Sequence, residues 1–110
     1  MTIYIGNKRF GVHKGINVYC GRPSILANPF KIPEHGDRTE LCKLFNDYFH
    51  KSVQEDTVLR MEVIRLYKLA FTNDITLICW CFPAQCHCET IKKFIDEKLK
   101  LKQLTKERLT

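Results

Sequence analysis

The order of the expected secondary-structure elements predicts an α/β fold: a small single-domain layered structure with a few-stranded, largely parallel sheet flanked by about three helices. The segment Ile75–Trp80 is a nearly continuous apolar run, which is typical of a strand covered on both faces. Helical apolar stripes lie before and after this segment, so a buried strand is entered from helices and leads into another helix.

The first two strands are predicted by short runs of β-branched and aromatic residues, Thr2–Ile5 and Ile16–Cys20. The segment 21–37 carries three prolines and two glycines, which predicts a long irregular loop. Loops of that length inside a compact domain are often functional. Its apolar residues indicate that it packs in an ordered way; they are Ile25, Leu26, Phe30 and Ile32.

Three helices are expected in the rest of the chain. Asp37 is expected to be the N-cap of the first helix, and Glu40, three residues later, completes a capping box. The first apolar stripe consists of Leu41, Leu44, Phe45, Tyr48 and Phe49. A second helix, from about Glu55 to Phe71, is expected to turn inward Val58, Met61, Ile64, Leu66, Leu69 and Ala70. A third, from about Cys88 to Leu104, is expected to turn inward Ile91, Phe94, Ile95 and Leu99.

Length and composition indicate one α/β domain over residues 1–104, followed by a basic C-terminal tail at 105–110. No apolar run approaches the roughly 20 residues of a membrane span, and the N-terminal residues lack the features of a secretory signal. We therefore expect a cytoplasmic protein with reduced thiols and no membrane partner. Disulfides are also disfavoured because two C-x-C pairs in one short segment would close almost no loop.

The net charge of +6 is concentrated toward the C-terminus. From Ile91 onward there are seven Lys or Arg against three acids, which gives 7 − 3 = +4. Such a segment can be a phosphate-seeking surface. A solvated helix face explains the same composition, and we favour that simpler interpretation.

The stretch CWCFPAQCHCE, residues 79–89, holds four cysteines, a histidine and a glutamate. It joins the buried strand to the last helix. In a Rossmann-like layered fold, ligands collect at this kind of place, beside the carboxyl ends of strands. Cys79 and Cys81 share one face of an extended chain and Trp80 takes the other. A thiol in the turn into the helix should have a lowered pKa, because the helix N-terminus favours negative charge.

Two chemical interpretations of this stretch remain open. Zinc would take Cys79, Cys81, Cys86 and His87 as ligands. However, common structural zinc sites use two well-separated pairs of ligands, whereas these candidates all lie within ten residues, and adjacent Cys86 and His87 are poorly placed to turn inward onto one ion. A remote fourth ligand such as His35 or Cys20 is possible, but nothing in the sequence supports it. Alternatively, Cys86 beside His87, with Glu89 near, has the parts of an activated nucleophile or an acid–base pair. The spacing favours the thiol–histidine interpretation, whereas Cys79 on its own is equally well explained as a small core residue.

A second constellation follows the second predicted strand. Glycine at 21 permits tight backbone geometry, and Arg22 offers a planar fork for phosphate or carboxylate. Ser24 and Asn28 supply hydrogen-bonding groups ahead of Phe30. Taken alone, this spacing is that of an ordinary loop with a surface arginine.

Together these residues resemble an uncharacterised family of small bacterial and phage proteins, the domain of unknown function 4326. An early G-R-x-S and an N-P-F match Gly21, Arg22 and Ser24, then Asn28, Pro29 and Phe30, with Arg38 before the first helix. The late motif L-x-C-W-C-x-P-x-x-C-H-x-D/E matches Leu77, Cys79, Trp80, Cys81, Pro83, Cys86, His87 and Glu89. The resemblance covers roughly Tyr4 to Ile95. Ala27 stands where the family usually has Gly, and Cys88 occupies a position the family leaves variable.

The resemblance implies that the two motifs form one site. Arg22 and helix N–H groups would hold an anion, Asn28 with Trp80 or Phe30 would hold a base, and His87 and Glu89 would transfer protons. The expected ligand-binding residues are Gly21, Arg22, Ser24, Asn28, Phe30, Arg38 and Trp80, and the expected catalytic residues are Cys86, His87 and Glu89.

We therefore expect a phage or bacterial protein, in the host cytoplasm if phage-encoded, that binds a nucleotide-like small molecule and has the parts to process it. The alternative is a non-enzymatic module, zinc-containing or basic, that contacts nucleic acid or a host protein.

Overall fold

The computed structural model of the chain describes residues 2–9, 13–21, 24–30, 36–80 and 86–109, with side chains described as far as residue 102. Its elements follow the order β1 (Ile3–Asn7), β2 (Ile16–Tyr19), α1 (Arg38–Glu55), α2 (Thr57–Leu69), β3 (Ile75–Cys79) and α3 (Cys88–Leu109). The strand and helix order is the one that the sequence predicts, although β1 continues two residues further than expected.

The three strands form one parallel sheet in the order β1-β3-β2, which confirms the expected fold class. The central strand is β3, the last in sequence. It pairs Ile75 with Ile3 of β1 and with Ile16 of β2. All five residues of β3 are buried. Its apolar composition follows from this position, because both of its faces are covered and both of its edges are paired.

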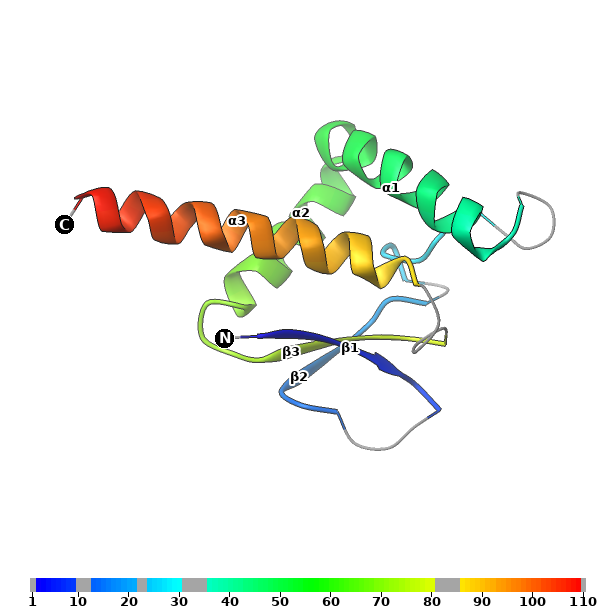
Figure 1. Cartoon of the computed structure of the whole chain (residues 1–110), viewed down its shortest axis with the longest axis horizontal. Coiled ribbons are helices and arrows are strands. Elements are labelled where there is room, and N and C mark those ends of the chain that lie inside the picture. The colour runs from blue at the N-terminus through cyan, green and yellow to red at the C-terminus, as the bar shows by residue number, and fades with distance from the viewer. Residues whose placement is uncertain (1, 10–12, 22–23, 31–35, 81–85, 110) are drawn as a thin grey trace.

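The helices lie on one side of the sheet (Figure 1). α3 packs directly on β1 and β3, and α1 and α2 pack against α3. On the opposite face, the hydroxyl of Thr76 in β3 donates a hydrogen bond to the carbonyl oxygen of Lys14 (2.7 Å). The ring of His13 lies so close to Gly6 that a Cβ at that position would overlap it. Described parts of the β1–β2 connection therefore cover β3 on the side away from the helices.

The core lies between the sheet and the three helices. Asp37 caps α1 by accepting a hydrogen bond from the backbone N–H of Glu40 (2.9 Å), as predicted. The expected stripe of α1 is confirmed at Leu41, Phe45 and Phe49, which are buried. Leu44 lies at the margin of this stripe and is exposed.

The expected inward face of α2 was wrong for three residues. Val58, Met61 and Ile64 are exposed, and the residues that α2 buries are Leu59, Val63 and Leu66, with Ala70 just after its end. The sequence of α2 is apolar on more than one side, so periodicity alone does not fix its orientation. Contact with α1 and α3 selects the buried side.

The last helix is longer than predicted. α3 continues to Leu109, so residues 105–109, expected as a tail, belong to the helix. Figure 1 shows its C-terminal end extending past the sheet. The inward residues are as expected, with Ile91 and Ile95 buried and Phe94 and Leu99 packed against the core. In the part of the chain that the structure describes, no helix is both long and apolar enough to cross a membrane.

Candidate functional site at the carboxyl edge of the sheet

The two motif-bearing segments meet where the parallel strands end, at the C-terminal side of the sheet, which we call its carboxyl edge. β2 and β3 are parallel neighbours, so the residues that follow them emerge side by side. The backbone N–H of Cys20 donates to the carbonyl oxygen of Ile78 (2.8 Å), which extends the pairing beyond the last residue of β2. The indole N–H of Trp80 donates to the hydroxyl of Tyr19 (3.0 Å). Segments about sixty residues apart in the chain thus share one edge.

Sulfur atoms cluster on the helix-facing side of this edge. Cys79, Cys86 and Cys88 are buried, and their sulfur atoms all lie within 4.8 Å of one another. The sulfur atoms of Cys79 and Cys86 are 2.7 Å apart. This arrangement could hold a metal ion. It includes Cys88, for which the family motif gives no support, and Cys81 lies outside the described residues.

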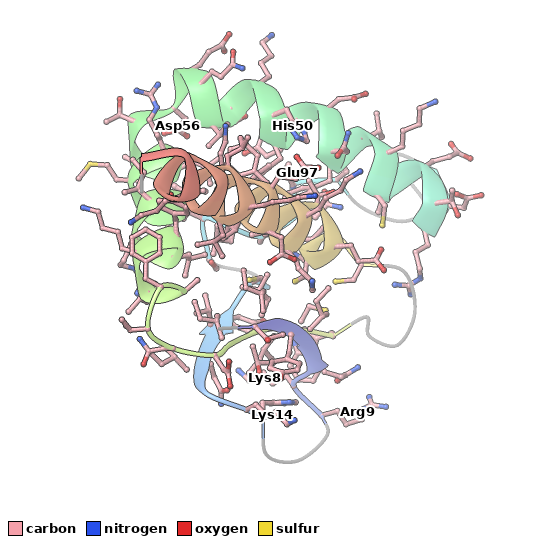
Figure 2. The ribbon with its side chains drawn as sticks, turned by 60° about the vertical axis from the view of Figure 1, so that its left-hand side comes forward. Lys8, Arg9, Lys14, His50, Asp56 and Glu97 are labelled. Carbon is pink, nitrogen blue, oxygen red and sulfur yellow. The ribbon has the colours of Figure 1, made fainter. Side chains whose placement is uncertain are left out.

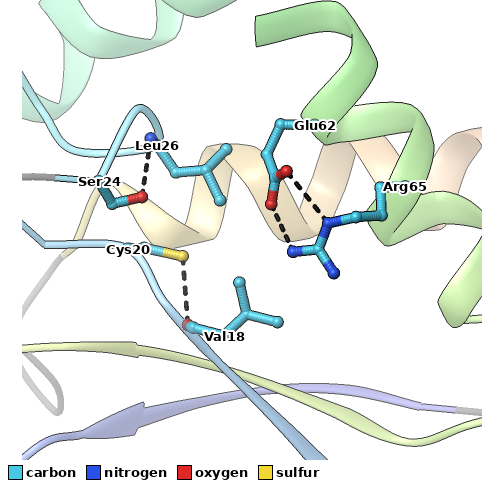
Figure 3. Close-up of polar contacts among 6 residues, drawn as sticks. All are labelled: Val18, Cys20, Ser24, Leu26, Glu62 and Arg65. Carbon is cyan, nitrogen blue, oxygen red and sulfur yellow. Dashed lines mark hydrogen bonds and ion pairs between the residues drawn. The ribbon is translucent and has the colours of Figure 1, made fainter. Parts of the chain in front are cut away.

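A fourth sulfur atom borders this group. The neighbouring thiols of Cys20, Cys79 and Cys86, followed by burial, raise the pKa of the Cys88 thiol, so the lowered pKa expected for a thiol in this turn does not apply to Cys88. Cys20 is 0% exposed, and its sulfur points back to the carbonyl oxygen of Val18 (3.5 Å; Figure 3). A thiol that stays protonated is the expected state of such a group when no ion is bound, because several neighbouring thiolates would repel one another.

His87 is packed into the interior beside these cysteines. It is 7% exposed, and its ring lies edge-on to that of Phe45 with centroids 5.1 Å apart. Nε2 lies 2.8 Å from the carbonyl oxygen of Cys20, and Nδ1 lies 3.7 Å from the sulfur of Cys86. Burial lowers the pKa of His87, but the contacts with Cys86 and the Cys20 carbonyl outweigh burial and raise it overall.

The three expected catalytic residues therefore occupy different surroundings. Cys86 and His87 are buried, whereas Glu89 is exposed in the first turn of α3. Both ring nitrogens of His87 already have protein neighbours. This geometry suits an imidazole that holds the two segments together better than one that exchanges protons with a ligand in solvent.

The N-terminus of α3 was expected to help bind an anion, but its N–H groups already have partners. The N–H of Cys88 donates to the sulfur of Cys86 (3.5 Å). Those of Glu89 and Thr90 donate to the carbonyl oxygens of Cys86 and His87 (3.1 Å each). Cys86 thus acts as the capping residue of α3. The positive end of the helix dipole is therefore directed at the Cys86 sulfur.

The polar residues of the loop after β2 shape its own turns. Ser24 Oγ accepts a hydrogen bond from the N–H of Leu26 (3.1 Å; Figure 3). Asn28 Oδ1 accepts one from the N–H of Phe30 (2.9 Å). The ring of Phe30 packs edge-on against Tyr48 at 6.0 Å between centroids. These contacts give each residue a structural role, as in the side-chain turns that serine and asparagine commonly form.

The remaining expected residues are placed as follows. Arg38 is the first residue of α1 and is exposed. Gly21 lies against Tyr19, whose phenol ring would overlap a Cβ at position 21. A Cβ here would therefore require the Tyr19 side chain to move, whereas the backbone angle does not call for glycine. Arg22, His35 and Pro83 lie outside the described residues.

Trp80, an expected ligand-binding residue, belongs to an aromatic and cationic cluster whose other two members, Lys8 and Tyr19, were missed by the sequence prediction. The cluster consists of Lys8, Tyr19 and Trp80, each of which directly follows or ends a strand. The ammonium of Lys8 lies 4.4 Å from the Tyr19 ring centroid and 5.9 Å from that of Trp80. Trp80 is 55% exposed, and its carbonyl oxygen accepts a hydrogen bond from the side chain of Asn7 (3.0 Å). Only the parallel pairing brings these residues together.

Further positive charge lies near this cluster. Figure 2 shows Lys8, Arg9 and Lys14 on the side of the sheet away from the helices. The ammonium of Lys14 lies 5.1 Å from the ring centroid of Tyr4. This face of the sheet therefore combines exposed cations with aromatic rings, whereas the helix-facing side of the same edge carries the sulfur atoms.

These features define a class: a small α/β domain with a three-stranded parallel sheet, whose carboxyl edge carries a buried thiol cluster and an exposed aromatic–cationic cluster. The family model described as "Domain of unknown function (DUF4326)" matches residues 6–97. The chain belongs to this family, as the two motifs predicted. Searches of curated proteins and of solved structures give no match.

Proposed function

We propose that this protein binds a nucleotide-like small molecule at the carboxyl edge of its sheet. The observation that supports this most strongly is the cluster of Lys8, Tyr19 and Trp80, in which a half-exposed indole and a cation stand together at the ends of three parallel strands. Parallel α/β sheets commonly bind ligands at this edge.

The cluster has the two groups that a nucleotide requires. An exposed indole offers a surface for stacking a base, an interaction of roughly 1–3 kcal/mol. The Lys8 ammonium lies within reach of that indole and can neutralise a phosphate. The hydrogen bond from Trp80 to Tyr19 restrains the indole, so less rotational freedom is lost when a ligand binds. Arg9 and Lys14 add positive charge on the same side (Figure 2).

The proposal concerns binding, because the surroundings of the sulfur and imidazole groups favour a structural role. His87 and Cys86 are buried and paired with protein atoms. In this proposal they hold the loop after β2 and the turn before α3 in place, and thereby position Tyr19 and Trp80.

A fluorescence titration tests this directly. Trp80 is the single tryptophan of the chain, so its emission reports on the proposed site. We expect AMP, ADP and ATP to change the emission saturably. Lys8→Ala should weaken phosphate-bearing ligands by about 10–100-fold, as expected for loss of a charged contact of 1.5–3 kcal/mol. Lys68→Ala is the matched control, because Lys68 lies at the end of α2 that leads to the opposite edge of the sheet.

Two results would contradict the proposal. One is an unchanged emission with every nucleotide at millimolar concentration. The other is much tighter binding of a single-stranded oligonucleotide than of any mononucleotide, with a steep fall in affinity as salt increases. That second result would favour the basic nucleic-acid-binding module instead.

A second candidate function is favoured by a separate observation, the buried group of Cys79, Cys86 and Cys88. We propose that this group binds zinc, because zinc prefers thiolates in closed structural sites. Elemental analysis of the purified protein should find about one zinc per chain, and a chelator should lower the unfolding temperature. Metal-free protein with reduced thiols and unchanged stability would count against a zinc site.

A further inference from the structure

We infer that Cys20 is the fourth ligand of a four-cysteine zinc site that is completed by Cys79, Cys86 and Cys88. This inference rests on the proposal that the cysteine group binds zinc, and it assigns the ligand set. It differs from the set suggested by the motif, which would use Cys81 and His87.

The sheet places Cys20 beside Cys79. The last β2–β3 pair joins Tyr19 with Ile78, and Cys20 and Cys79 are the next residues on each strand. The N–H of Cys20 donates to the carbonyl oxygen of Ile78, so the parallel ladder continues to this point. Neighbouring strands are about 4.8 Å apart, which is a suitable starting separation for two ligands of one ion.

Cys88 links this pair to the helix. It is the first residue of α3 and is buried, and its sulfur lies within 4.8 Å of those of Cys79 and Cys86. The set therefore draws on the end of β2, the end of β3 and the start of α3. Ligands from three separate elements can surround an ion, which residues confined to one short turn do not readily do.

Zinc ligation would require the sulfur atoms of Cys79 and Cys86 to lie further apart than they do. Zinc–sulfur bonds of about 2.3 Å in a tetrahedron imply sulfur–sulfur separations of about 3.8 Å. Cys79 and Cys86 are closer than this, at 2.7 Å. Zinc would therefore separate this pair, and Cys20 would need to turn its sulfur from the Val18 carbonyl toward the centre of the group.

His87 is directed away from the ligand position. Its Nε2 is used by the Cys20 carbonyl oxygen at 2.8 Å, and Nδ1 lies beside the Cys86 sulfur. The backbone N–H of Cys88 donates a hydrogen bond to the Cys86 sulfur. Hydrogen bonds of this kind, together with the N-terminus of α3, stabilise the excess negative charge of four thiolates around a divalent ion.

A zinc ion bound by four cysteines would hold in place the start of the loop that begins at Gly21. The loop is entered directly from Cys20, and Tyr19 of the aromatic–cationic cluster precedes it. Removal of zinc should therefore weaken nucleotide binding as well as lower stability, although no ligand atom belongs to both sites.

X-ray absorption spectroscopy of the intact zinc-loaded protein tests the ligand set without any substitution. We expect a first shell of sulfur alone at about 2.3 Å. A shell that contains a nitrogen or oxygen neighbour would overturn the inference, while leaving the proposal of a zinc site intact.

Variants then identify which cysteines contribute. With Co²⁺ as a spectroscopic probe, Cys20→Ser should lose one thiolate's share of the charge-transfer absorption and bind more weakly by at least tenfold, since even the loss of second-shell groups commonly costs about 10–100-fold. Cys42→Ser is the matched control, because Cys42 lies on α1 and is only partly buried, whereas Cys20 is buried and follows the strand that pairs with β3. Cys81→Ser and His87→Ala test the motif-based alternatives and should keep a four-sulfur spectrum.

These outcomes distinguish failure of the ligand assignment from failure of the zinc proposal. If Cys20→Ser behaves as Cys42→Ser does while wild type binds one ion, the fourth ligand is another residue and this inference fails. If reduced wild-type protein binds neither Zn²⁺ nor Co²⁺, the zinc proposal itself fails. A disulfide found between Cys79 and Cys86 in protein purified with a reductant present would also overturn both.

Discussion

The Nε2 atom of His87 lies 2.8 Å from the carbonyl oxygen of Cys20, a residue 67 positions earlier in the chain. Since a carbonyl oxygen accepts, the ring donates this hydrogen bond. It joins the turn before α3 to the end of β2, which are the two segments that carry the family motifs. Its burial makes it a structural contact between these segments.

Replacement of His87 by Ala should lower the free energy of unfolding by at least about 1–3 kcal/mol, because the buried carbonyl oxygen of Cys20 loses its side-chain partner. His87→Gln should recover part of this loss, since an amide can donate the same bond. Urea denaturation in the presence of chelator measures both without any contribution from metal. A loss no larger than that of His50→Ala, an exposed histidine on α1, would contradict the structural role.

Gly15 should not tolerate a side chain. Its backbone has φ +66, a conformation that residues other than glycine rarely adopt. A Cβ there would also overlap the carbonyl oxygen of Asp74, which accepts a hydrogen bond from the N–H of Ile16. Gly15→Ala is expected to cost at least about 1–3 kcal/mol. Thermal unfolding measures this, and an unchanged midpoint would show that the start of β2 is arranged differently.

Leu59 and Met61 form a matched pair on α2. Leu59 is 1% exposed and Met61 is 66% exposed. Leu59→Ala should therefore lower the free energy of unfolding by about 2–5 kcal/mol. Met61→Ala should change it by no more than about 0.5 kcal/mol. Chemical denaturation of the two variants compares them directly, and equal losses would mean that α2 packs with a different face.

Gly21→Ala should affect the proposed ligand site more than stability. A Cβ at this position would overlap the phenol of Tyr19, which can move away because it is a side chain at the edge of the structure. Its movement would break the hydrogen bond from Trp80. We expect a shifted Trp80 emission maximum and weaker nucleotide binding, with a small change in unfolding temperature. Tyr19→Phe should shift the emission in the same direction, and an unaltered spectrum in both variants would contradict the contact.

Much of the fold follows from local patterns in the sequence. The apolar run at 75–80 predicts a strand buried on both faces, because only such a strand can place every side chain away from water. The spacing of Leu41, Phe45 and Phe49 matches one face of a helix, and Asp37 has the side chain that an exposed helix start requires. The buried face of α2 could not be predicted in the same way, since apolar residues occur on two of its sides.

The sequence by itself determined the fold class, the family and the meeting of the two motifs at one edge, because parallel strands bring the residues that follow them to the same side. Tertiary structure alone decided which residues lie together there. Cys20, Cys88 and Lys8 come from different elements, and no spacing along the chain relates them. Their neighbours depend on the strand order β1-β3-β2, which pairs the first and second strands with the last one. Burial likewise decided that His87 is a contact between segments, since exposure is a property of packing and not of local sequence.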